Sequence, residues 1–302
     1  MSLRPAWLTF RRYAAATTGM TLTLFAIGVY TAATGSGLAC QAQWPLCSDQ
    51  LIPALTINPD FIEWFHRVWA MFTGFLIIGV AGWTWLGSFD RRTRLAATLA
   101  VAILPIQSTV GAITVTIGGL VPGGYTVSTH AAHLIVALTI FTLLGLVTMW
   151  GGREDGPGGG STRLLRIGVT VAVVGVVASA VFSRAVPFLT YSPGAQATFY
   201  VAGLAAHLGL VAAVVAASEG VDGGLSGIDP STARTVRTLS AGAMAGLVAT
   251  LLLGRDLVLY DSFWQGVNLV ALAAALLLAA AAAWTLRTAD AAPRTSTPIG
   301  GD

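Results

Sequence analysis

Apolar stretches of about 20 residues recur along this chain, and that length lets an α-helix cross the hydrocarbon core of a bilayer. Charged residues make up only 10% of the 302 residues, whereas a soluble domain carries about 25%. Hydrophobic residues make up 55%. The sequence therefore predicts an all-α integral membrane protein, with the lipid bilayer as its surroundings.

We distinguish eight such stretches. They cover residues 13–35, 62–86, 95–117, 129–150, 164–183, 198–217, 238–256 and 263–286. The first is longer than the apolar core of a signal peptide, which has roughly 7–15 residues. We therefore expect it to be the first membrane-spanning helix.

The distribution of arginine predicts the topology. If the N-terminus is cytoplasmic, 13 of the 16 basic residues fall in cytoplasmic segments, as the positive-inside rule requires. Both termini are thus predicted to be cytoplasmic, in a multi-pass protein of the plasma membrane. Since topology accounts for the basic charge, we expect no nucleic-acid partner. The 13 residues are Arg4, Arg11, Arg12, Arg91, Arg92, Arg94, Arg153, Arg163, Arg166, Arg234, Arg237, Arg287 and Arg294.

A Gly-rich segment, EDGPGGGS at residues 154–161, has the composition of a flexible linker. It separates the first four predicted helices from the last four. We therefore predict an N-terminal four-helix bundle at 1–152, a cytoplasmic linker at 153–163 and a C-terminal four-helix bundle at 164–302. The similar layout of the halves indicates that the bundles are pseudo-symmetric. Assembly into a homo-oligomer is left open.

Both cysteines of the chain, Cys40 and Cys47, lie in the longest outside loop, residues 36–61. The predicted topology exposes them to an oxidising compartment, where disulfides persist. We expect a disulfide or a redox-switchable dithiol, with two free thiols as the alternative.

All four histidines lie in predicted spanning helices or at their outside ends. An ionisable residue at membrane depth is costly and points by default to a functional site. For a single one, a core histidine bonded to a carbonyl is the simpler interpretation. Because all four histidines have such positions, we favour roles as cofactor or metal ligands. His66 and His133 lie at matched depth, each about one turn into its helix from the outside, while His207 lies deeper, in GLAAHLGLV.

Histidines on facing helices of a four-helix bundle are suited to hold a cofactor. His66 and His133 are predicted to ligate a haem iron from its two faces. Zinc is the competing metal, but no third or fourth ligand has suitable spacing. His130 lies on the same helical face as His133, three residues earlier. It is an alternative ligand, a propionate partner or a proton carrier.

A family resemblance rests on two adjacent motifs. GLACQAQWPLCSDQLIP, followed by IEWFHR, resembles the first outside loop and second helix of haem A synthase. The eight-helix layout agrees. The resemblance implies an oxidoreductase that converts the C8 methyl of haem O to a formyl group, giving haem A for terminal oxidases. It also implies a substrate haem in the N-terminal bundle and a haem b cofactor, with its iron, in the C-terminal bundle.

The resemblance further implies roles and partners. His66 and His133 would hold haem O, with Glu63 beside the reacting edge. Glu63 shares a helical face with His66 and is suited to accept or relay protons. The alternative for Glu63 is an ion pair with Arg67, which would otherwise bind a haem propionate. Expected partners are the farnesyltransferase that makes haem O and an unidentified electron donor.

The chain departs from the family in its second half. The last helix has no histidine: where the family often has His-Gln, this chain has Trp264-Gln265. His207 also lacks the Arg that often follows it in the family. The second haem is therefore five-coordinate through His207, bound by another residue, or absent.

Two other functions compete with the enzyme. A non-catalytic b-type haem protein is one, although paired-His cytochromes usually carry both ligands on one helix. A transporter or an oxidase assembly factor is the other, with Gln107 and Asn268 as the few polar residues at mid-membrane.

Overall fold

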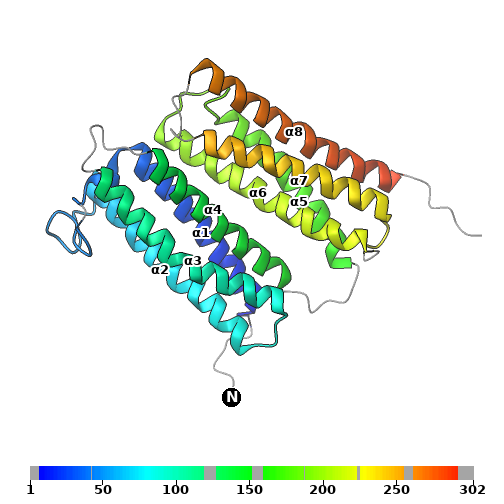
Figure 1. Cartoon of the computed structure of the whole chain (residues 1–302), viewed down its shortest axis with the longest axis horizontal. Helices are drawn as coiled ribbons and strands as arrows, with labels where there is room; N and C mark the ends of the chain where they lie inside the picture. Colours follow the sequence, from blue (N-terminus) through cyan, green and yellow to red (C-terminus); the bar gives the residue numbers. More distant parts are fainter. Residues whose placement is uncertain are drawn as a thin grey trace, which may run out of the picture.

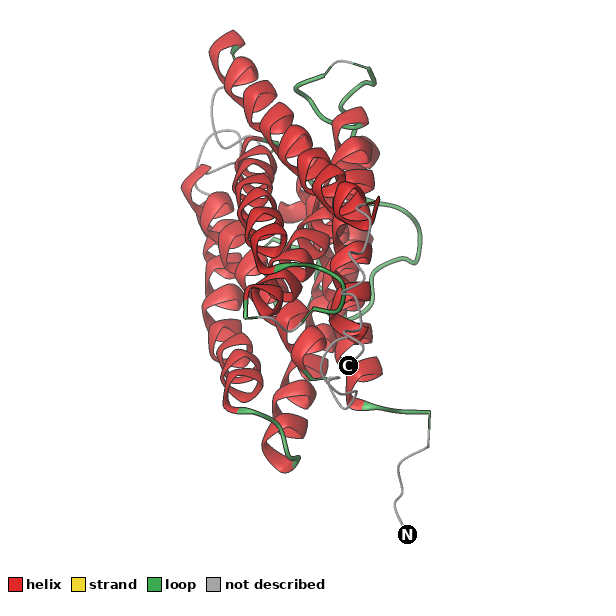
Figure 2. Ribbon diagram, turned by 90° about the vertical axis from the view of Figure 1, so that its right-hand side faces the viewer, coloured by secondary structure: helices red, strands yellow, loops and turns green. Residues whose placement is uncertain are grey.

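The computed structural model describes residues 7–41, 43–118, 127–151, 159–186, 188–222, 225–254 and 261–291. Every regular element in this part of the chain is helical (Figure 2). Eight of the helices are long and apolar enough to cross a membrane, which confirms the predicted all-α membrane class. The elements are α1 (Phe10–Ala33), the 3₁₀ helix η1 (Ser36–Leu38), α2 (Pro59–Leu86), α3 (Arg91–Gly118), α4 (Val127–Trp150), α5 (Gly159–Val181), α6 (Pro193–Val221), α7 (Pro230–Leu253) and α8 (Ser262–Ala291).

Most helices begin a few residues before their predicted apolar stretches, and in three of them a capping residue followed by proline starts the helix before the hydrophobic segment begins. Asn58, Ser192 and Asp229 cap α2, α6 and α7, and a proline follows each cap in the first turn. Such caps satisfy backbone N–H groups that the helix leaves free. Within the predicted linker at 153–163, α5 begins at residue 159, and residues 152–158 lie outside the described part.

The helices form two groups that lie side by side in Figure 1. In the first bundle, α1–α4, helices α1 and α3 each contact α2 and α4, so α2 and α4 face each other across the bundle. In the second bundle, α5–α8, helices α5 and α7 each contact α6 and α8, so α6 and α8 take the equivalent places. The bundles meet where α6 packs against α1 and α4.

The helices of both bundles run between two ends of the molecule, the terminal end and the loop end. The terminal end is where α1 begins and α8 ends, and the loop end carries residues 34–58 between α1 and α2 (Figure 1). The two bundles are packed differently along this axis. The buried clusters belonging to the first bundle lie in its terminal half: Phe10, Ala14, Val80, Ala81, Ala96, Ala97 and Val147, with Ile77, Ala100, Ile140 and Leu144 beside them.

The second bundle is closely packed over its whole length. Its terminal half holds one buried cluster, which includes Leu165, Ala216 and Val236. Its loop half holds another, which includes Phe199, Tyr200 and Leu251, with Phe25, Val29 and Phe141 of the first bundle against it. Among the described residues, the buried clusters of the first bundle itself thus lie at the terminal end, and the predicted site lies at the other end.

Candidate functional site

Glu63 is a nearly fully buried carboxylate one turn into α2, with 2% of its surface exposed. It accepts a hydrogen bond of 2.6 Å from the backbone N–H of Cys40 and forms an ion pair with Arg67, one turn further on. A buried carboxylate needs such partners, because an unpaired charge away from water is very costly. The ion pair between Glu63 and Arg67, which was the alternative prediction for Glu63, is therefore present.

The loop that carries the cysteines covers this carboxylate. Cys40 and Cys47 form a disulfide, as the sequence predicted. The Arg67 guanidinium donates to the carbonyl of Gln43, between the two cysteines, as well as to Glu63. The disulfide-closed loop and the start of α2 are thus joined through two charged side chains.

His66 lies one turn after Glu63 on α2, and its ring lies against α1 at Gly28. A Cβ placed on Gly28 would be only 3.0 Å from Cε1 of His66, so the glycine makes room for the ring. Among the described residues, none provides a hydrogen-bond partner for the buried Nδ1 of His66. An orphan nitrogen of this kind is uncommon and indicates a group that binds something else.

His133 has the matching arrangement on α4. Its ring lies against Gly111 of α3, where a Cβ would again be 3.0 Å from Cε1. The side-chain nitrogen of Gln107 lies 3.2 Å from Nε2 of His133. His66 and His133 are close enough to interact electrostatically, although their helices face each other across the bundle.

The other two histidines are placed differently. His130 is half-buried, one turn nearer the start of α4 than His133. His207 lies midway along α6, only 3% exposed, with its Nε2 2.8 Å from Oγ1 of Thr142 on α4. His207 is thus at the contact between the bundles. Glu63, Arg67, His66 and His133 gather in the loop half of the first bundle, and His207 does not join them.

Three residues beside the histidines had no assigned role in the sequence analysis of the haem site. Gly28 and Gly111 accommodate the two rings, and Gln107 contacts one of them. A signal existed for Gln107, which lies two residues after Pro105, inside α3. It is a polar residue in a long apolar helix, but only the fold brings it to His133.

The arrangement of the histidines bears on whether they would bind zinc or a haem iron. Within the described ranges, no group of three or more His, Cys, Asp and Glu side chains is arranged to hold a metal ion. Protein zinc sites use three or four such ligands. Two imidazoles on opposite helices suit instead the two axial positions of a haem iron.

The fold and the paired imidazoles define a multi-pass helical membrane protein with a candidate haem site in one bundle. Comparison with known proteins supports a family resemblance over part of the chain. A sequence model described as "Cytochrome oxidase assembly protein" matches residues 54–183, which include Glu63, His66 and His133 but not His207. The haem A synthase family resemblance of this chain is thereby confirmed.

The similar proteins carry two names. Heme A synthase of Bacillus licheniformis is 34% identical over 124 residues, 40% of this chain and 38% of that protein. Heme A synthase of Halalkalibacterium halodurans is 34% identical over 140 residues, 46% and 44% of the two chains. Protoheme IX farnesyltransferase of Halobacterium salinarum is 35% identical over 127 residues, which are 42% of this chain and 27% of that protein. The chain spans less than half the length of these relatives.

Proposed function

We propose that this protein is a haem A synthase, which binds haem O between α2 and α4 and oxidises its C8 methyl to a formyl group. The observation that carries the proposal is the matched pair of His66 and His133. Each lies on one of two facing helices and each is set against a glycine of the neighbouring helix. Two axial imidazoles would fix the iron and therefore the position of the macrocycle edge.

The interior around these histidines supports a large apolar ligand. The described buried clusters of the first bundle lie in its terminal half, away from the two histidines. The unpartnered Nδ1 of His66 adds a second argument. A ligand that engages this ring would offset part of the cost of burying it.

Glu63 is proposed to act on the substrate edge. Conversion of a methyl to a formyl group adds one oxygen atom and is a net four-electron oxidation (R–CH3 + H2O → R–CHO + 4 H⁺ + 4 e⁻), so the reaction needs an oxygen source, a nearby proton acceptor and a redox partner for the electrons. Glu63 lies one turn from His66 on the same face of α2. The Cys40 N–H and Arg67 orient the carboxylate and stabilise its charged form, the form that accepts a proton.

The proposed surroundings follow from composition and from the relatives. The arginine distribution supports a plasma-membrane protein with cytoplasmic termini and places the disulfide loop outside. The similarity to a protoheme IX farnesyltransferase supports an enzyme of that kind as the supplier of haem O. The haem b that the resemblance implies in the second bundle does not fit the residues present there.

A second candidate function is a non-catalytic haem-binding factor in oxidase assembly. It is favoured by one specific observation, the Trp264-Gln265 pair on α8 where the family often has His-Gln. Such a protein would bind haem between His66 and His133 and release it unchanged.

Co-expression with a source of haem O, followed by chromatography of the extracted haems, distinguishes the two functions. We expect haem A with the wild type and with Asp60→Asn, a carboxylate change one turn earlier on α2, and haem O alone with Glu63→Gln. Haem O unchanged in all three membranes would overturn the enzyme and leave the assembly factor.

A further inference from the structure

The two bundles share a helix register that relates their interior positions. Helices α2 and α6 begin alike, with the caps Asn58 and Ser192 each followed by a proline. Eight residues after the cap, α2 has His66 and α6 has Tyr200, and a phenylalanine precedes each of them. Tyr200 therefore takes the place of His66 in the second bundle.

The other pair of facing helices matches in the same way. Six residues after its first helical residue, α4 has His133 and α8 has Asn268, and a leucine follows each of them. Asn268 is fully buried. Both histidines of the first bundle thus have counterparts in the second bundle that are not histidines.

The hydroxyl of Tyr200 is bonded within its own bundle. The side chain is 1% exposed, and its hydroxyl donates a 2.5 Å hydrogen bond to the carbonyl of Leu251 on α7. Its ring packs edge-on against Phe199, with 5.1 Å between centroids. The phenol therefore closes the interior at the level where the first bundle has its imidazole.

Close helix packing leaves no layer for a macrocycle in the second bundle. A Cβ on Gly168 of α5 would lie 2.6 Å from the carbonyl oxygen of Gly209 on α6. A Cβ on Gly246 of α7 would lie 2.9 Å from the carbonyl oxygen of Ala271 on α8. Neighbouring backbones thus touch, and between them the buried Leu204, Leu247, Leu272 and Ala275 fill the centre.

The side chains that ligate haem iron in proteins are His, Cys, Met and Tyr. Helix α8 contains none of the four types along its whole length. On the other helices of the second bundle they are Tyr200, His207 and Met244. His207 is turned to Thr142 of the first bundle, and Met244 packs against the core cluster. No two of them face each other as an axial pair.

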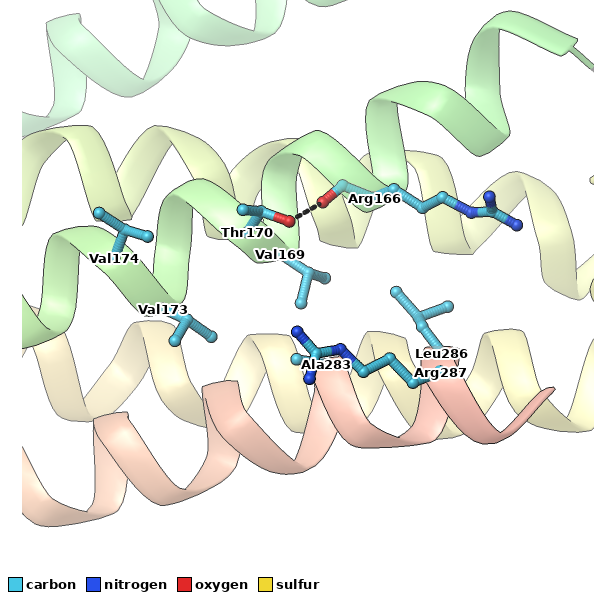
Figure 3. A pocket seen from close by; sticks show the side chains of 8 residues that line it. All are labelled: Arg166, Val169, Thr170, Val173, Val174, Ala283, Leu286 and Arg287. Atoms are coloured by element: carbon cyan, nitrogen blue, oxygen red, sulfur yellow. Dashed lines mark hydrogen bonds between the residues drawn. The ribbon is translucent and has the colours of Figure 1, made fainter. Parts of the chain in front are cut away.

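A hollow on the second bundle does not provide another place for iron. It is a groove between α5 and α8, lined mainly by Val169, Val173, Ala283 and Leu286, with Arg166 and Arg287 beside them (Figure 3). None of its lining side chains is a haem ligand. The groove lies between two helices at their terminal end and is separate from the bundle centre.

We propose that the second bundle of this protein is closed to haem and that the chain binds a single haem, in the first bundle. This inference rests on the proposed function only for the identity of the molecule between His66 and His133. The second bundle acts as a packing partner, and the contact between His207 and Thr142 joins it to α4.

The test is the number of haems per chain in the purified full-length protein, loaded with haem B and measured as pyridine haemochrome against protein concentration. We expect one haem per chain in the wild type, the same in His207→Ala and Tyr200→Phe, and none in the His66→Ala, His133→Ala double variant. Two haems per chain in the wild type, or loss of haem in His207→Ala with retention in the double variant, would overturn the inference.

A measurement on the wild type alone covers the case in which the double variant does not fold. Electron paramagnetic resonance of the loaded protein should show one low-spin haem species with two imidazole ligands. A second haem species, or no bound haem at all, would overturn the single-haem assignment. One haem per chain without any haem A formation would overturn the proposed enzyme alone.

Discussion

The two four-helix bundles have the same layout but treat their loop ends in opposite ways. The first bundle has Glu63 and His66 in its interior and sets glycines beside its imidazoles. The second bundle has Tyr200 and Asn268 at the corresponding positions and fills the space around Tyr200 with Phe199 and Leu251. A few interior side chains thus decide whether this layout makes a binding site or a packed core.

This difference has a thermodynamic side. A buried polar group without a partner costs about 1–3 kcal/mol, so a position that keeps one is locally less stable than a position whose polar groups are paired. The first bundle keeps Nδ1 of His66 without a partner among the described residues. In the second bundle, Nδ1 of His207 has no partner among these residues either, whereas the hydroxyl of Tyr200, at the position that corresponds to His66, donates to Leu251. Mutations at the loop ends of the two bundles are therefore expected to have different effects on haem binding and stability.

The largest effect is expected from the histidines. Replacing His66 or His133 by alanine removes an axial ligand, and haem affinity should fall by more than the roughly 10–100-fold that loss of a supporting hydrogen bond costs at metal sites. His207→Ala should leave haem affinity nearly unchanged, because His207 contacts Thr142 instead. Titration of the purified variants with haem B, followed in the Soret band, measures both. Equal losses for all three histidines would remove the distinction between the bundles.

The second largest effect is expected on the free energy of unfolding when the buried ion pair between Glu63 and Arg67 is broken. Arg67→Ala leaves Glu63 charged and 2% exposed, which typically costs about 3–5 kcal/mol of unfolding free energy. The matched control is Arg92→Ala, because Arg92 pairs with Asp90 at the surface, where such pairs contribute about 0–1 kcal/mol. Unfolding in detergent followed by circular dichroism compares them. Similar stabilities of the two variants would show that Glu63 is not a buried charge.

The disulfide between Cys40 and Cys47 should contribute somewhat less to the free energy of unfolding. It closes a short loop, and a loop of this size is expected to add about 2–3 kcal/mol by restricting the unfolded chain. Reductant should therefore lower the unfolding temperature of the wild type and leave the Cys40→Ser, Cys47→Ser variant unchanged. A reductant effect of the same size in that variant would assign the change to something other than this bond.

The smallest effect is expected from the glycines behind the imidazoles. Gly28→Ala or Gly111→Ala puts a methyl 3.0 Å from a histidine ring, and crowding of this kind costs about 1 kcal/mol, or about fivefold in haem affinity. Gly19→Ala on α1 is the control, since a Cβ there has nothing within 4 Å. Haem titration of the three variants decides the point, and equal affinities would show that the rings do not depend on the glycines.

Much of this fold was predictable from the sequence, because membrane insertion needs apolar segments of fixed length. The eight helices and the pairing of Glu63 with Arg67 followed from hydropathy and from helical spacing. Helix starts were less accurate, because Asn58, Ser192 and Asp229 begin their helices ahead of the apolar stretch. The disulfide was predicted from loop position and compartment alone.

Contacts between distant segments were not predictable in this way. Nothing local in the sequence shows that Gly28 lies behind His66, or that His207 faces Thr142 on another bundle. Those facts depend on how each helix is rotated about its own axis, which tertiary packing sets. For the same reason, depth alone did not show which side chain His207 faces.

The most direct test of the account is the axial ligation of a haem bound to His133→Met and to His207→Met, read by absorption and electron paramagnetic resonance spectroscopy. Axial ligand identity controls these spectra. The account predicts that His133→Met changes the spectrum from two imidazoles to one imidazole and one thioether, whereas His207→Met leaves it unchanged. An unchanged spectrum in His133→Met together with an altered one in His207→Met would contradict a haem site in the first bundle.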